Sequence, residues 1–106
     1  MENEFGVRLD SNGYAPSVIQ PYDNGFCFLC GKMGDLARHE VFHGASRSKS
    51  KELGCWVSLC PECHSELHKK DASIDRHLKL IGQRAAMLEY HWTVEDFRER
   101  FGKNYV

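Results

Sequence analysis

The sequence lacks any apolar run that approaches the roughly 20 residues a membrane-spanning helix needs, so no membrane role is expected. Its first ten residues, MENEFGVRLD, contain neither a basic segment nor an apolar one. We therefore expect no secretory signal and a cytoplasmic location. A strong net charge is also absent, because 14 basic and 15 acidic side chains leave −1 over 106 residues. This balance argues against a protein that binds nucleic acid by electrostatic attraction alone.

Cysteine, by contrast, is plentiful. In a reducing compartment the five cysteines need a role other than disulfide bonds. Four of them form two Cys-x-x-Cys pairs, and thiolates in two such turns can close a tetrahedral zinc site. We predict one structural Zn2+ bound by Cys27, Cys30, Cys60 and Cys63, which would stabilise a core as small as this one. Cys55 is left over and is interpreted as a small buried hydrophobic residue.

Composition and turn signals divide the chain into three segments of one α+β domain. Residues 1–25 carry one basic and four acidic side chains, and we expect an extended N-terminal arm with one hairpin, a strand over 5–10 and a turn at 12–13. Residues 26–70 contain both cysteine pairs and form the zinc-stabilised core. Residues 71–106 show helical periodicity and form C-terminal helices that pack on the core.

The core segment has a simple order of elements. A short strand is expected within residues 36–43, followed by a polar loop over 44–54 that is rich in Ser, Lys and Arg. A second strand is expected over 55–60, and Pro61 suits the first turn of a helix. Strand, loop, strand and helix together make a ββα unit.

The C-terminal segment predicts two helices. Asp71 or Ser73 can cap the first, whose apolar residues recur at spacings of three and four: Ile74, Leu78, Ile81, Ala85 and Leu88. The sequence TVED at 93–96 resembles a capping box and predicts a final helix that runs to about Phe101 and ends at Gly102.

Histidines offer a second group of metal ligands. His64 and His68 are four residues apart on the predicted helix, so their rings fall on one face. Because His64 directly follows Cys63, it points away from the sulfur cluster, and His39 on the preceding strand can supply a third ligand. Three imidazoles that leave a coordination position open suit a catalytic divalent metal, either Mg2+, Mn2+, Ni2+ or Zn2+. The alternative is that His64 and His68 are surface residues of a polar helix.

The segments CFLC, LARHEVF and CWVSLCPECHSELH, with a basic loop before the last, resemble the HNH endonucleases of the ββα-metal class. The resemblance covers Cys27 to about His68 and is to the branch with two Cys-x-x-Cys pairs. The C-terminal residues are similar to the tail of small phage-encoded HNH proteins of Gram-positive bacteria. The resemblance implies a metal-dependent DNA endonuclease that leaves 5′-phosphate and 3′-hydroxyl ends. It also implies DNA as a partner, and a link to phage packaging or recombination proteins.

The family's site residues transfer by position. His39 corresponds to a metal ligand on the first strand, and His64 and His68 correspond to the ligands on the helix. The family's general base falls on Glu40, and a carboxylate can take that role. Glu40 could instead bind the metal, which would leave the base role to His39 or His43.

Two further features bear on activity. The family's central asparagine, which pins the loop by hydrogen bonds, falls on Cys55, and a thiol cannot replace an amide there. Arg47, Lys49 and Lys51 on the predicted loop could contact DNA phosphates, or could simply keep a solvated loop charged. The competing function is a catalytically weak or inactive zinc-binding module that binds nucleic acid or a protein partner. Cys55 and Glu40 favour that module, whereas the three histidines favour the nuclease.

Overall fold

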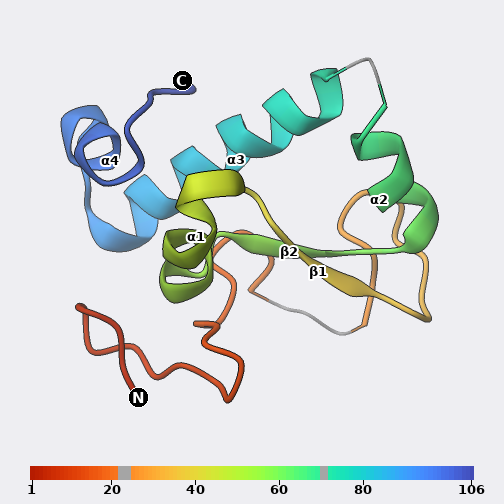
Figure 1. Ribbon diagram of the computed structural model, residues 1–106, viewed down its shortest axis with the longest axis horizontal. Helices are drawn as coiled ribbons and strands as arrows, with labels where there is room; N and C mark the ends of the chain where they lie inside the picture. Colours follow the sequence, from red (N-terminus) through yellow and green to blue (C-terminus); the bar gives the residue numbers. More distant parts are fainter. Residues whose placement is uncertain (22–24, 70–71) are drawn as a thin grey trace.

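The computed structural model describes residues 1–21, 25–69 and 72–106, and it has a small α+β fold (Figure 1). The cap predicted at Asp71 lies outside these residues. A two-stranded sheet and four α-helices follow one another along the described chain: β1 (Ala37–Glu40), a 3-10 turn η1 (Gly44–Ser46), α1 (Arg47–Leu53), β2 (Trp56–Leu59), α2 (Pro61–Leu67), α3 (Ser73–Tyr90) and α4 (Val94–Phe101). None of the described helices is both long and apolar enough to cross a membrane.

The sheet pairs β1 with β2 in an antiparallel register that sets His39 opposite Val57. β2 lies within the predicted range and is buried along its whole length. β1 is shorter than the predicted strand 36–43. The strand ends there because Phe42 bonds Ser50 instead of β2. The Phe42 N–H donates to the Ser50 hydroxyl at 3.0 Å, and this hydroxyl donates to the Phe42 carbonyl at 2.8 Å.

The polar loop predicted between the strands is wrong, because most of it is the helix α1. Ser50 and Leu53 give this helix a buried side that its polar sequence conceals. The helix ends at Gly54, which adopts a left-handed conformation with φ of 76°. A Cβ at this position would lie 2.2 Å from the carbonyl oxygen of Pro16, so only glycine fits between the helix and the N-terminal arm.

The start of α2 and both ends of α4 follow local sequence rules. Pro61 begins α2 as predicted. The capping box of α4 is confirmed, since the Thr93 hydroxyl accepts from the Asp96 N–H and the Thr93 N–H donates to the Asp96 carboxylate. Gly102 ends α4 in a left-handed conformation, also as predicted. Aromatic rings join this helix to the rest of the core, with Phe42 and Phe101 centroids 4.7 Å apart.

The apolar face predicted for α3 is only partly right. Leu78 is buried, but Leu88 is 80% exposed, and the buried side is completed by Gly82, Gln83 and Ala86. Gln83 is buried because its amide bonds the C-terminal tail, with its Oε1 accepting from the Tyr105 N–H. Ser73 is not the cap of this helix, since the cap position is Ala72, which makes no side-chain bond.

The N-terminal arm contains the predicted turn but not the predicted strand. An isolated bridge pairs Glu2 with Arg8, and Gly13 donates its N–H to the Asp10 carbonyl. The arm crosses the edge of β2, where the Trp56 indole N–H donates to the Ala15 carbonyl at 2.7 Å. In Figure 1 the arm lies beside α1 and the sheet, on the opposite side of them from α3.

Candidate metal centre and histidine cavity

The four predicted zinc ligands meet in one cluster. Their ligand atoms all lie within 4.8 Å of one another, and the sulfurs of Cys30 and Cys60 are 3.7 Å apart. Cys27 and Cys30 come from a tight turn in which the Gly31 N–H donates to the Cys27 carbonyl. Cys60 caps α2, and Cys63 lies one turn further on, so its N–H reaches the Cys60 sulfur at 3.4 Å. The cluster could hold a metal such as zinc with all four positions filled by protein.

The thiols of Cys27 and Cys63 differ in pKa. Burial acts to raise the pKa of Cys27, but hydrogen bonds from nearby backbone N–H groups outweigh it and bring the pKa to about 6. The thiolate is the form that binds zinc. Burial and the neighbouring thiol groups raise the pKa of Cys63.

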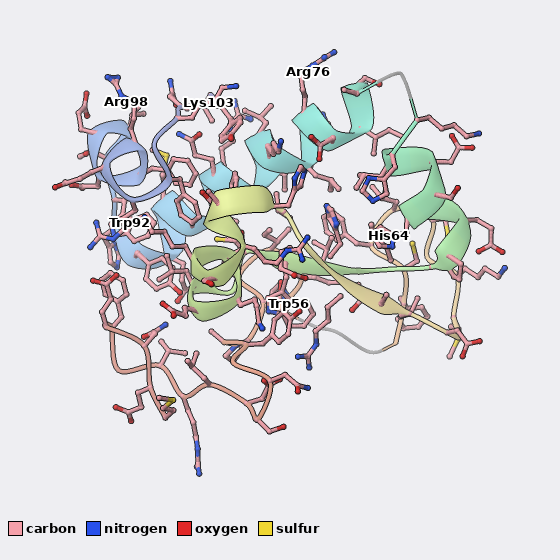
Figure 2. All side chains as sticks on the ribbon, viewed as in Figure 1. Trp56, His64, Arg76, Trp92, Arg98 and Lys103 are labelled. Carbon is pink, nitrogen blue, oxygen red and sulfur yellow. The ribbon has the colours of Figure 1, made fainter. Side chains whose placement is uncertain are left out.

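A separate cavity of about 350 Å3 lies beside the sheet and α2. Its lining contains every predicted catalytic and histidine ligand residue, together with two arginines: Arg38, His39, Glu40, His43, Arg47, His64 and His68. His64 lies on the side of α2 that faces the sheet (Figure 2). The predicted histidine set is therefore brought together around one cavity. Among the described residues, however, only the four cysteines bring three or more ligand atoms within 4.8 Å.

His39 is the most deeply placed of these rings. It is 5% exposed, and its Nε2 has no hydrogen-bond partner among the described residues. Burial and the neighbouring histidines, of which His64 has the largest effect, lower its pKa to about 4. The ring is therefore neutral at pH 7 and has an unused nitrogen, which is the state in which an imidazole binds a metal ion.

Glu40 is held by two groups from different elements. The Tyr14 hydroxyl of the arm donates to its Oε2 at 3.0 Å, and the Arg47 Nε lies 3.6 Å from its Oε1. Burial and the Glu40 carboxylate raise the pKa of Tyr14, which keeps the hydroxyl a donor. Sequence analysis missed Tyr14, and a lone tyrosine 26 residues before its partner offers no pattern that could have indicated it.

His43 has a partner of its own on α3. Its Nε2 lies 3.2 Å from Oδ1 of Asp75, and the other carboxylate oxygen of Asp75 lies 2.9 Å from Lys79. Burial acts to raise the pKa of Asp75, but Lys79 and His43 outweigh it, so the pKa is lowered and the group is a carboxylate. Asp75 was also missed, because an acidic residue in a first helical turn is common for reasons of helix stability alone.

The three basic residues of the predicted loop do not share one surface. Arg47 lines the histidine cavity, whereas the Lys49 ammonium bonds the Arg100 carbonyl and the Lys51 ammonium lies 4.9 Å from the Tyr14 ring centroid. Residues two apart on a helix point to different sides, so Arg47, Lys49 and Lys51 diverge on α1. On the predicted loop they could have faced the same side.

Cys55 is buried as predicted. It is fully enclosed in the core, and burial raises the pKa of its thiol to about 12, so it stays protonated. The segment before it is held instead by Ser50, whose hydroxyl bonds the Phe42 backbone in both directions. The structure thus supplies a polar clamp at a different position from the one that the resemblance implied.

Comparison with known proteins gives no family assignment. No protein-family model, curated protein or solved structure matches the chain. The functional argument therefore depends on the geometry of the cysteine cluster and the histidine cavity.

Proposed function

We propose that the protein is an HNH-type, ββα-metal DNA endonuclease that uses a divalent cation. The observation that carries the proposal is the meeting of three histidines around one cavity: His39 from β1, His64 from α2 and His68 directly after the end of α2. β1, which carries His39, pairs antiparallel with β2, and α2 follows β2 directly. Apart from the helix α1 between the strands, this is the strand, strand, helix order that the resemblance implies. The cysteine cluster joins the start of that helix to the turn before β1 and would fix the rings in place.

The ring separations support a shared cation. Three imidazoles bound at about 2.1 Å would have ring centroids roughly 4.6 to 5.3 Å apart at octahedral or tetrahedral angles. The centroids of His64 and His68 are 5.1 Å apart, and those of His39 and His64 are 5.4 Å apart. His39 and His68 are further apart, at 6.4 Å. A small movement of His68, at the end of α2, would complete the set.

The remaining cavity residues fit phosphodiester hydrolysis. Glu40, fixed by Tyr14 and Arg47, takes a proton from the attacking water. Arg38 and Arg47 at the cavity wall bind the phosphate oxygens. His39, His64 and His68 would hold a divalent cation, which would supply positive charge to offset the negative charge on the phosphate and on the leaving 3′ oxygen. His43, held by Asp75, is the alternative base.

A plasmid-cleavage assay tests the proposal. Metal-stripped protein reloaded with zinc at the cysteine cluster would be given Mg2+, Mn2+, Ni2+ or extra Zn2+ separately, and nicked or linear product is expected with at least one cation. His64→Ala should abolish cleavage, and His77→Ala should not, because His77 is an exposed histidine on α3 outside the cavity. Equal cleavage by wild type and His64→Ala would contradict the proposal.

The competing function is a zinc-binding module without catalysis. It is favoured by the histidine nitrogens, which do not converge as closely as the cysteine sulfurs do. This alternative predicts that DNA or a protein partner binds equally well to wild type and His64→Ala, with no product under any cation. The same assay, run beside a binding measurement, therefore separates the two functions.

A further inference from the structure

A second cavity adjoins the histidine cavity on the side of the N-terminal arm. It has a volume of about 420 Å3, and its lining is mostly apolar and aromatic: Arg8, Leu9, Asp10, Tyr14, Ala15, Pro16, Arg38 and Trp56. Arg38 lines both cavities and forms the wall between them. The proposed chemistry uses none of the arm residues that shape this second cavity, apart from Tyr14.

The dividing wall consists of the Arg38 guanidinium packed over two aromatic rings. The Arg38 guanidinium carbon lies 4.4 Å from the Tyr14 ring centroid and 4.8 Å from that of Trp56. The same group lies 2.7 Å from the Asp10 carboxylate, which holds it in place. The Arg38 side chain is still 38% exposed, so part of its surface is open to a ligand.

The charge of the cavity favours an anionic ligand with a flat apolar part. Asp10 is offset by Arg38, which leaves Arg8 at the rim as the unbalanced charge. Arg8 is exposed and forms no ion pair with any side chain in the described ranges. Trp56 is only 5% exposed and its ring lies under Arg38, so the surface open to a ligand is the guanidinium plane. Guanidinium planes are among the surfaces on which unstacked nucleobases pack, and an arginine beside them can bind the attached phosphate.

We propose that this cavity binds one nucleobase of DNA that has left the base stack, next to the phosphate in the histidine cavity. This inference rests on the proposed nuclease function and names its substrate class: DNA with an unpaired nucleotide at the cut, as in a single-nucleotide bulge. Such a nucleotide costs least to unstack, so the cavity selects it over fully paired duplex.

Binding is measured with a cleavage-deficient protein that carries His64→Ala and Trp92→Phe, in which Trp56 is the remaining tryptophan. The probes are a duplex with a single-thymidine bulge and the same duplex with an abasic bulge, which keeps the phosphates and lacks the base. We expect the thymidine bulge to bind roughly 5- to 150-fold more tightly, the range that one stacked base provides, and to quench Trp56 fluorescence. Equal affinity for the two probes, with no quenching, would overturn the inference.

Two charge substitutions test whether the preference for the thymidine bulge arises in this cavity. Leu9→Glu, introduced into the same background, places a carboxylate in the cavity and should remove the preference for the thymidine bulge while the abasic duplex still binds. Leu88→Glu is the matched control, because Leu88 is an exposed leucine of α3 outside both cavities. Loss of the preference in both variants, or in neither, would contradict a base-binding role for this cavity.

The outcomes also separate this inference from the proposed function. Metal-dependent cleavage by the wild type without any preference for the thymidine bulge would leave the nuclease standing and remove the base-binding cavity. A clear preference and Trp56 quenching, with no cleavage under any cation, would support the cavity and contradict the nuclease.

Discussion

Asp75 Oδ1 lies 3.2 Å from Nε2 of His43, so the first turn of α3 holds a side chain of the histidine cavity. Lys79, one turn further along α3, pairs with the second oxygen of the same carboxylate. The strand and helix that carry the histidines thus bound the cavity, and α3 contacts it through Asp75. This contact gives His43 a fixed ring orientation, which is what a base or a ligand needs.

The identity of the general base is open to direct test. Glu40→Gln keeps the hydrogen bond from Tyr14 possible and removes the proton acceptor, so we expect cleavage to fall by about 10²- to 10⁴-fold, the usual contribution of a general base. Asp75→Asn, which weakens the contacts of Asp75 with His43 and Lys79 and removes no cavity residue, should cost less. Single-turnover cleavage rates at saturating metal give the comparison. A larger loss for His43→Ala than for Glu40→Gln would assign the base to His43.

The cysteine cluster makes a prediction about stability. Cys60→Ala removes a ligand and the cap of α2, so we expect loss of bound zinc and loss of cooperative unfolding, because metal binding contributes directly to folding. Cys55→Ala is the matched control, since Cys55 is buried but is not part of the cluster. Zinc content and thermal unfolding report both effects. If Cys60→Ala keeps one bound zinc and an unchanged midpoint, the cluster does not support the fold.

Features governed by local rules could be predicted, and features set by tertiary contacts could not. The turn at Gly13, the start of α2 at Pro61 and the capping box at Thr93 each depend on neighbouring residues, and all are present. The helix α1 was missed because one of its two buried residues is Ser50, a polar residue whose burial depends on its distant partner Phe42.

The residues of the candidate site also fall into a group that could be predicted from the sequence and a group that could not. The two Cys-x-x-Cys pairs and the His64/His68 pair, about one helical turn apart, are visible in the sequence. The structure gathers the cysteines into one cluster and places the histidines around one cavity. Tyr14 on the arm and Asp75 on α3 contact the cavity residues Glu40 and His43 and lie far from the motif in sequence. Nothing in their own neighbourhoods distinguishes them from ordinary surface residues.

Ser50 should be more important for stability than its size suggests. Ser50→Ala leaves the N–H and C=O of Phe42 buried without their hydroxyl partner, and each unpaired buried group costs about 1 to 3 kcal/mol. We expect the free energy of unfolding, measured in urea, to fall by about 2 kcal/mol or more. Ser48→Ala, on the exposed side of the same helix, should change it by less than about 0.5 kcal/mol. Equal effects of the two substitutions would rule out the clamp.

The pKa of His39 predicts how stability depends on pH. Its pKa is lowered from 6.5 to about 4 in the folded protein, so between these values the unfolded chain binds a proton that the folded chain does not. Stability should therefore fall as the pH decreases from about 6.5 to about 4, and above 6.5 this group should have no effect. Urea unfolding of wild type and His39→Asn across this range tests the point, because asparagine cannot titrate. The difference in unfolding free energy between the two proteins should shrink or reverse as the pH falls. A difference that stays constant from pH 7 to pH 4.5 would show that His39 does not titrate below its ordinary pKa.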